Sequence, residues 1–197
     1  MSVAVIKYDR HMVRWQPDSR GRLQQAAIEL FTERGFEQTT AAQIAERAGL
    51  TERTFFRHFA DKREMLFDGS PRLQQHFVDA VSAAPADASP FEAVTAGLDA
   101  VAAFFVELDH SRGRQAIIDS DASLQERELI KMSRLSTAIA EALRARGVTE
   151  PAASVLGQAA IAVFHVAFGQ WVAPGNTRGY ADLMHESLAE LRTITST

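Results

Sequence analysis

The sequence has 197 residues, of which 46% are hydrophobic and 23% charged, which excludes a disordered chain and fits one large or two small globular domains. It contains no cysteine, and this excludes disulfide bonds, thiolate metal ligands and a cysteine nucleophile. The net charge is -4, yet residues 1–70 carry 11 basic and 10 acidic side chains, so the first third is where a nucleic acid would bind.

The first residues predict a protein that stays in the cytoplasm. The first charged side chain is Lys7, and it is not followed by an apolar segment of the kind that a secretory signal contains. Residues 1–18 are expected to form a flexible extension. Arg10, Arg14 and Trp15 within it fit either an unstructured tail or an arm that enters the minor groove of DNA, and both interpretations stay open.

Apolar residues recur at helical spacing along the chain, and no convincing alternation of period two is present, so we predict an all-helical fold. The first helix is expected over residues 19–34, where apolar side chains share one face and Gly35 ends the segment. A short second helix is expected over residues 40–48. A third begins after Thr51, a residue type that caps helix N-termini.

The rest of the chain predicts further helices, about nine in total. They are expected over residues 61 to the low 80s, with Gly69 and Pro71 as kink positions, and over 89–109, 114–119, 123–146, 151–172 and 177–194. The segment from Val155 to Ala173 approaches the length of a membrane span, but it contains Gln158, His165 and Gln170. Because polar groups are costly in a bilayer core, we predict a buried helix and no membrane partner.

The second and third predicted helices are short and are joined by a tight turn that contains Gly49. This geometry is typical of a helix-turn-helix, whose second helix can enter a major groove. Phe55 and Phe59 would face inward. The outward face offers side chains that can hydrogen-bond to bases or phosphates, namely Glu52, Arg53, Thr54 and Arg57. On spacing alone, an ordinary corner of a helical bundle is an equally open interpretation.

The continuous string from Arg22 to Phe67 resembles the DNA-binding domain of the TetR family of bacterial transcriptional regulators. Four motifs carry the resemblance: Ala-Ala-x-x-Leu-Phe, Gly-Phe-x-x-Thr-Thr, Ile-Ala-x-x-Ala-Gly and Thr-Phe-Phe-Arg-His-Phe. The resemblance implies a three-helix DNA-binding domain over residues 19–67. It also implies a helical regulatory and dimerisation domain over residues 68–197.

The resemblance also implies the DNA contacts. Thr40, His58 and Lys62 would contact phosphates, and residues 51–57 would form the recognition helix. Phe56 stands where many members have a tyrosine whose hydroxyl contacts a phosphate, so that contact is missing here. The full predicted DNA-binding set is Thr40, Thr51, Glu52, Arg53, Thr54, Arg57, His58 and Lys62.

Aromatic residues gather in two later segments of the chain and predict either a hydrophobic core or an effector cavity. We predict that Phe104, Phe105, Phe164, His165 and Phe168 line such a cavity, with Met132 and Trp171 beside them. Few charges accompany these rings. The expected effector is therefore small and apolar or amphipathic, with one or two polar groups for His165 to bind.

The last two predicted helices carry apolar stripes that would pair in a two-fold homodimer. Small residues on the first of them would allow close approach, and two helices from each subunit would form a four-helix interface. The predicted interface consists of Val155, Ala159, Ala162, Val163 and Val166 on one helix and Leu183, Leu188, Leu191 and Ile194 on the other.

These observations favour a ligand-responsive repressor that binds a palindromic operator in double-stranded DNA as a homodimer, although the same features would serve an activator. The alternative is a helical small-molecule-binding or scaffolding protein that has lost DNA binding. The six histidines show no spacing typical of metal ligands, and no nucleophile elbow or glycine-rich phosphate loop is present. We therefore predict no enzymatic activity, no metal and no cofactor.

Overall fold

The computed structural model describes residues 18–195, and this part of the chain is helical with no strand, as predicted. The expectations for residues 1–17, including Arg10, Arg14 and Trp15, lie outside the described residues. The helices are α1 (Ser19–Arg34), α2 (Ala41–Arg47), α3 (Glu52–His58), α4 (Glu64–Phe67), α5 (Ser70–Ala83), α6 (Pro90–Ala102), α7 (Leu108–Asp119), α8 (Ala122–Ala145), α9 (Ala152–Val172) and α10 (Tyr180–Thr195).

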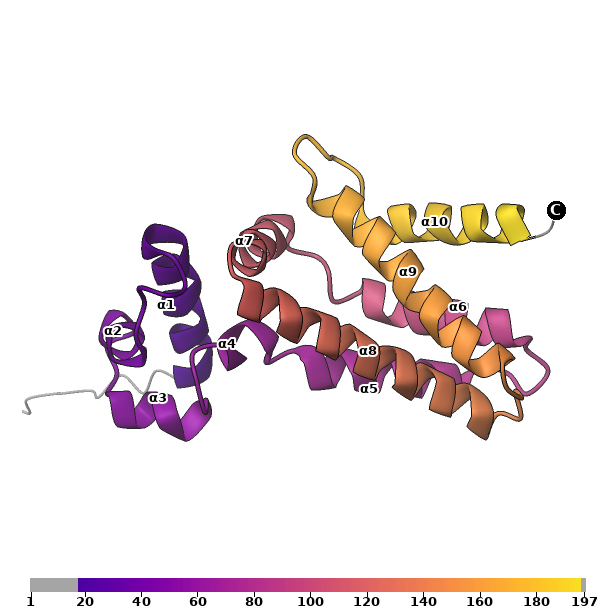
Figure 1. Cartoon of the computed structure of the whole chain (residues 1–197), viewed down its shortest axis with the longest axis horizontal. Coiled ribbons are helices and arrows are strands. Elements are labelled where there is room, and N and C mark those ends of the chain that lie inside the picture. Colours follow the sequence, from indigo (N-terminus) through magenta and orange to yellow (C-terminus); the bar gives the residue numbers. More distant parts are fainter. Residues whose placement is uncertain (1–17, 196–197) are drawn as a thin grey trace, which may run out of the picture.

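Figure 1 shows a small helical unit, α1–α3, at one end of an elongated molecule. A larger bundle of α5, α6, α8, α9 and α10 fills the other end, and α4, α7 and the start of α8 lie between the two. Each end has its own cluster of buried apolar side chains. The molecule is therefore built around two hydrophobic cores.

The short helices of the small unit begin at side chains that cap them. The Thr40 hydroxyl accepts a hydrogen bond from the Gln43 amide, and the Gln43 side chain accepts one from the Thr40 amide, so both ends of a capping box are present. The Thr51 hydroxyl caps α3 by accepting from the Thr54 amide. Gly49 has φ +64°, a conformation that favours glycine, and it turns the chain between α2 and α3.

The core of the small unit extends into the regulatory end of the chain. Ile117 and Ile118 from the end of α7 and Leu124 from the start of α8 are buried in the same cluster as Phe55 of α3 and Leu66 of α4. A movement of the α7–α8 junction would therefore disturb packing next to the helix-turn-helix.

Close helix contacts hold the larger bundle together. A Cβ atom added at Gly157 of α9 would lie 2.7 Å from the backbone oxygen of Ser136, so only glycine lets α9 approach α8 this closely. Among the described residues, α9 is the one helix long and apolar enough to cross a membrane. Its inner face is buried in the core of the bundle, as predicted, and includes Ala160, Phe164 and Ala167.

Three helix boundaries differ from the prediction. The expected helix from residue 61 to the low 80s is split into α4 and α5, because Pro71 lacks an amide hydrogen and occupies the first turn of a new helix. The helix expected over 89–109 ends at Ala102, and α7 starts at Leu108 instead of Arg114. Phe104 and Phe105 therefore lie in a connecting segment, where Phe105 packs against α9.

Candidate DNA-binding surface and ligand cavity

The α3 helix presents a polar face to solvent and an aromatic face to the core. Phe55 and Phe59 are only 0% and 2% exposed, and their rings lie 5.9 Å apart. Within the described residues, no hydrogen bond or ion pair engages the side chain of Arg53. The exposed or half-buried side chains of this surface are Thr51, Glu52, Arg53, Thr54, Phe56, Arg57 and His58. An anchored helix of this kind can enter a groove without losing its own packing.

Two residues of the predicted DNA-binding set, Thr40 and Thr51, cap the N-termini of α2 and α3. Thr40 and Thr51 are exposed, and each accepts a hydrogen bond from a backbone amide of the helix that it caps. A capping hydroxyl that accepts still has a hydrogen to donate. The free amides and the dipole of a helix N-terminus attract anions at the same position.

Lys62 has contacts that the sequence did not indicate. Its ammonium group donates to the backbone oxygens of Phe36, Glu37 and Thr39, at 2.7, 3.2 and 3.0 Å, and lies 4.2 Å from the centre of the Phe36 ring. An ammonium has three hydrogens, so these carbonyls use its full donor capacity. Lys62 fixes the segment before α2 in this structure, and a phosphate contact would require it to exchange one of these bonds.

His58 is also tied into the small unit. Its Nε2 atom lies 2.8 Å from the hydroxyl of Ser19, which links the end of α3 to the start of α1. One ring nitrogen is thus occupied, and only the other is left for the phosphate contact that the resemblance implies.

A cavity of about 680 Å³ lies between the small unit and the bundle. Its walls come from α1, α4, α5, α7, α8 and α9 and from the segment that carries Phe104 and Phe105. Its volume is within the range of known small-molecule sites. Five of the seven predicted residues line it, namely Phe104, Phe105, Phe164, His165 and Phe168.

The placement predicted for Met132 and Trp171 is wrong. Both side chains are 3% exposed and belong to the hydrophobic core instead of the cavity wall. Met132 lies on α8 one position after Lys131, which does line the cavity, so the two point in different directions from the helix. Trp171 packs against Phe105, Phe168 and Tyr180.

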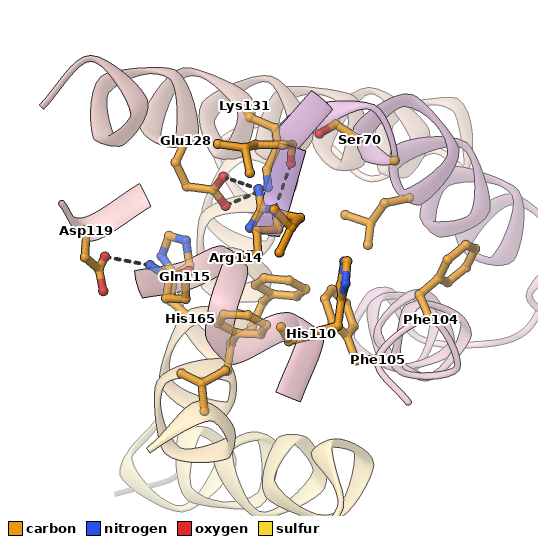
Figure 2. Close-up of a pocket in the computed structure, with 18 of the residues that line it drawn as sticks. Ser70, Phe104, Phe105, His110, Arg114, Gln115, Asp119, Glu128, Lys131 and His165 are labelled. Atoms are coloured by element: carbon orange, nitrogen blue, oxygen red, sulfur yellow. Dashed lines mark hydrogen bonds and ion pairs between the residues drawn. The ribbon is translucent and has the colours of Figure 1, made fainter. Parts of the chain in front are cut away.

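The second departure from expectation is a group of charged residues on one side of the cavity. Figure 2 shows Arg114 of α7 with Glu128 and Lys131 of α8. The Glu128 carboxylate accepts from Arg114 Nη2 at 2.9 Å and from Lys131 Nζ at 2.6 Å. All three side chains are less than one-fifth exposed. The expectation of few charges near the rings is therefore wrong.

Burial and mutual attraction shift the pKa values of this group. Burial lowers the pKa of Lys131 to about 8, Arg114 adds to this effect, and Glu128 opposes it. Burial favours a higher pKa for Glu128, but the charges of Lys131 and Arg114 outweigh it and hold that pKa below its ordinary value. Burial also lowers the pKa of His165, which lies close enough to Glu128 and Lys131 for both charges to act on it.

The matches to known families cover both ends of the chain. Residues 23–68 match the family described as bacterial regulatory proteins, tetR family. Residues 88–195, more than half of the chain, match the family described as the MftR C-terminal domain. The chain belongs to the TetR family. Regulators of this family bind operator DNA, function as dimers and bind small-molecule effectors.

Curated TetR-family relatives match only part of the chain. The transcriptional regulator TcmR of Streptomyces glaucescens is 39% identical over 83 residues, 42% of this chain and 37% of TcmR. The transcriptional activator FasR of Mycolicibacterium smegmatis is 31% identical over 112 residues, 53% of this chain and 47% of FasR. The chain spans less than half the length of the curated relatives it matches.

Solved TetR structures extend the likeness of fold to most of the chain. A TetR-family regulator from Mesorhizobium loti has a TM-score of 0.58 at 19% identity, covering 89% of this chain and 94% of that chain. Thermus thermophilus FadR, a TetR-family repressor solved with lauroyl-CoA, has a TM-score of 0.53 at 24% identity, covering 88% and 93%. At these identities the likeness concerns the fold alone.

The predicted dimer stripes are only partly on the surface of this TetR-family protomer. Val163, Leu183 and Leu188 are buried within the protomer, so they cannot meet a partner without unfolding. Ala159 and Leu191 are half-buried. The remaining members are exposed, namely Val155, Ala162, Val166 and Ile194. The surface stripe is therefore mainly that of α9.

Sequence reasoning missed the charged side of the cavity. Arg114, Glu128 and Lys131 look like the solvated face of helices, the usual place for charges. One signal was present: Glu128 and Lys131 are three residues apart, a spacing that brings them to one helix face. Their burial depends on how α7 lies across α8 and α9, and no local pattern reports that crossing.

Proposed function

We propose that this protein is a cytoplasmic, ligand-responsive transcriptional regulator that binds a palindromic operator, most simply as a repressor. The observation that carries this proposal is the α3 helix, which is anchored by buried Phe55 and Phe59 and presents Arg53 and Arg57 to solvent. The match to the tetR family over residues 23–68 supports it. The protein then acts by binding and release of DNA, not by catalysis.

A homodimer is the second part of the proposal. Val155, Ala162 and Val166 form an exposed apolar stripe on α9, and Val155 and Val166 are 62% and 54% exposed. Val166→Glu should dissociate the dimer in sedimentation while the protomer stays folded, as its helical circular dichroism would show. The obvious alternative, Leu188→Glu, would place a charge in the core and unfold the protein, so it is unsuitable. A Val166→Glu protein that stays dimeric would contradict this interface.

The cavity is the third part, and it accounts for the response to a ligand. Leu66 of α4, next to the helix-turn-helix, and residues of α7, α8 and α9 line the same space. A small amphipathic effector bound there would contact both ends of the molecule at once. An effector that displaces α4 would alter the spacing of the two recognition helices, and a 100-fold loss of DNA affinity requires about 2.7 kcal/mol of coupling.

Selection of bound sequences from random DNA tests the proposal directly. A regulator should enrich a palindrome whose half-sites lie about one DNA turn or a little more apart. Arg53→Ala should weaken the selected site by about 1 to 3 kcal/mol and flatten discrimination at one position in each half-site. If folded, dimeric protein enriches no sequence, the alternative of a helical small-molecule-binding or scaffolding protein is favoured instead.

Lys62→Ala distinguishes a phosphate contact from a structural role. The phosphate role, implied by the family resemblance, predicts weaker binding to all sequences and a salt slope reduced by about 1. The structural role predicts weaker binding to all sequences with an unchanged slope, together with a lower melting temperature, because three backbone oxygens lose their donor. Titration of the Kd against salt separates the two.

A further inference from the structure

One arginine joins the cavity to the DNA-binding unit. Arg114 of α7 donates from Nε to the backbone oxygen of Leu66 in α4 at 2.7 Å, and from Nη2 to Glu128 of α8 at 2.9 Å. Both partners line the cavity, and so does Arg114 itself. The guanidinium group therefore spans from the regulatory bundle to the short helix that follows the helix-turn-helix (Figure 2).

The charges around Arg114 are unbalanced. Arg114 and Lys131 share a single carboxylate, Glu128, and both cations also lie within 6 Å of the Phe67 ring centre, at 5.3 and 5.8 Å. The other carboxylate at the cavity, Asp119, accepts instead from Gln115 at 2.8 Å and is exposed. The lowered pKa of Lys131 agrees with a buried cation that has too little negative charge beside it.

The remaining titratable groups at the cavity do not supply that negative charge. His110 and His165 are neutral or cationic, never anionic, and they line the wall with Arg114 and Lys131. The rest of the wall is largely apolar or aromatic, with Leu73, Phe104, Phe105, Phe164, Phe168 and Val172. One side of the space thus favours an anion and the other favours an apolar body.

We propose that the effector is an amphiphilic anion whose carboxylate or phosphate head binds Lys131 and Arg114, while its apolar body lies against the phenylalanine wall. The same head group competes for Arg114 with Glu128 and with the Leu66 carbonyl. Because Arg114 has a fork of donors that suits a carboxylate or a phosphate, an anion can draw it away from Leu66. The loss of that bond releases α4 from α7, and this last step rests on the proposed function.

Ligand binding is tested on the full chain without DNA. Calorimetric titrations with decanoate, decyl phosphate and decanol compare two anionic heads with a neutral one on the same alkyl chain. We expect at least one anion to bind about tenfold tighter than decanol or better, as for a lost charge-assisted hydrogen bond. The anion that binds tighter identifies the head group. Anions that bind no tighter than decanol, or not at all at millimolar concentration, would overturn the proposal.

Charge variants place the site within the cavity. Lys131→Met should weaken anion binding relative to decanol binding, so that the ratio of the two Kd values falls towards one. The matched control is Arg127→Met, because Arg127 also lies 5.3 Å from the Phe67 ring but does not line this cavity. Glu128→Gln releases both cations and should strengthen anion binding several-fold. If Lys131→Met fails to fold, Glu128→Gln still decides, since unchanged or weaker anion binding by it contradicts the assignment.

Coupling to DNA is measured separately, with the operator recovered by selection. Arg114→Lys keeps the positive charge but lacks the fork that reaches both Leu66 and Glu128. We expect it to bind the anion within about threefold of the unmodified protein but to bind the operator more weakly before any anion is added, because the bond to Leu66 is already lost, so that adding the anion changes its DNA affinity little. Normal release from DNA by Arg114→Lys would refute the coupling role. A protein that binds anions but enriches no operator would refute the proposed function and leave the anion site standing.

Discussion

The small helix-turn-helix unit and the cavity are encoded in different ways. In the small unit, the caps that start α2 and α3 lie within three residues of their partners, so local contacts define where these two helices begin. Around the cavity, Arg112 bonds to the backbone oxygens of Val172 and Ala173, 60 and 61 residues away. A surface made by local rules can be recognised from the sequence, whereas a space made by distant helices depends on how they cross.

The junction between α7 and α8 links the bundle to the core of the small unit. Ile117, Ile118 and Leu124 lie in the bundle half of the sequence but are buried in the core of the small unit. A linker of a few polar residues would have let the two ends move independently. The shared core instead makes α7 and the start of α8 the route by which an occupied cavity can affect α3.

The largest loss of stability is expected from a substitution where the aromatic wall of the cavity meets the hydrophobic core. Phe105 packs against Phe164, Phe168 and Tyr180 with ring centres 5.5, 5.5 and 4.9 Å apart, whereas Phe104 is 37% exposed and its ring contact within the described residues is with His76. Phe105→Ala should lower the free energy of unfolding by about 3 to 5 kcal/mol, and Phe104→Ala by less than about 1 kcal/mol. Chemical denaturation of the two proteins measures this difference.

An equal loss in the two variants would mean that Phe104 is a core residue and does not belong to the wall of a ligand site. In that case the cavity would be smaller in solution than in the structure. Phe104→Ala should instead alter the affinity for decanoate while leaving the melting temperature of the ligand-free protein close to that of the unmodified chain.

The second effect tests the close packing of the larger bundle. A Cβ atom added at Gly97 of α6 would lie within 3.0 Å of three atoms of the buried Phe77 ring. Gly97→Ala should therefore cost about 1 to 3 kcal/mol of stability. The control is Gly113→Ala in α7, where nothing lies within 4 Å of the added atom, and it should gain about 0.5 to 1 kcal/mol from helix propensity. Loss of stability in both variants would contradict the packing described for α6.

The third effect concerns pH and the charged side of the cavity. The pKa of Lys131 is lowered by burial from 10.5 to about 8. Between these values the unfolded chain binds a proton that the folded chain lacks, so the free energy of unfolding should rise with pH by at most about 1.4 kcal/mol per unit. The difference between the unmodified protein and Lys131→Met isolates this rise, because the raised pKa of buried Tyr180 affects both proteins alike.

Denaturation at a series of pH values from 7 to 10 measures that difference. A constant difference across this range would show that Lys131 is well solvated in solution. Glu128 and Lys131 would then form an ordinary surface ion pair. Their burial could no longer serve as an example of a feature that depends on how distant helices cross.

The features that could be predicted from the sequence are those made by local contacts, and the features that could not be predicted depend on distant ones. Thr40 and Thr51 reveal their helices because a hydroxyl before a helix acts within one turn. The phenylalanines at 164 and 168 predict a shared helix face because of their spacing of four. The break after Ala102 is set by the packing of Phe105 against α9, and the burial of Lys131 by the crossing of α7 over α8, so neither is visible in a local pattern. The contacts of Lys62 could not be predicted for the same reason, since the carbonyl groups that it binds lie 23 to 26 residues away.

The smallest effect tests whether the recognition helix is as locally determined as its caps indicate. Thr51→Ala removes the hydroxyl that accepts from the Thr54 amide and should cost about 1 kcal/mol of stability. Thr32→Ala is the control, because Thr32 is exposed in the interior of α1 and its hydroxyl donates only to the Ile28 carbonyl one turn earlier. Alanine is the better helix former there, so this change should cost nothing or stabilise slightly. Equal losses in the two proteins would mean that α3 is held by Phe55 and Phe59 alone and that its N-terminal cap contributes little.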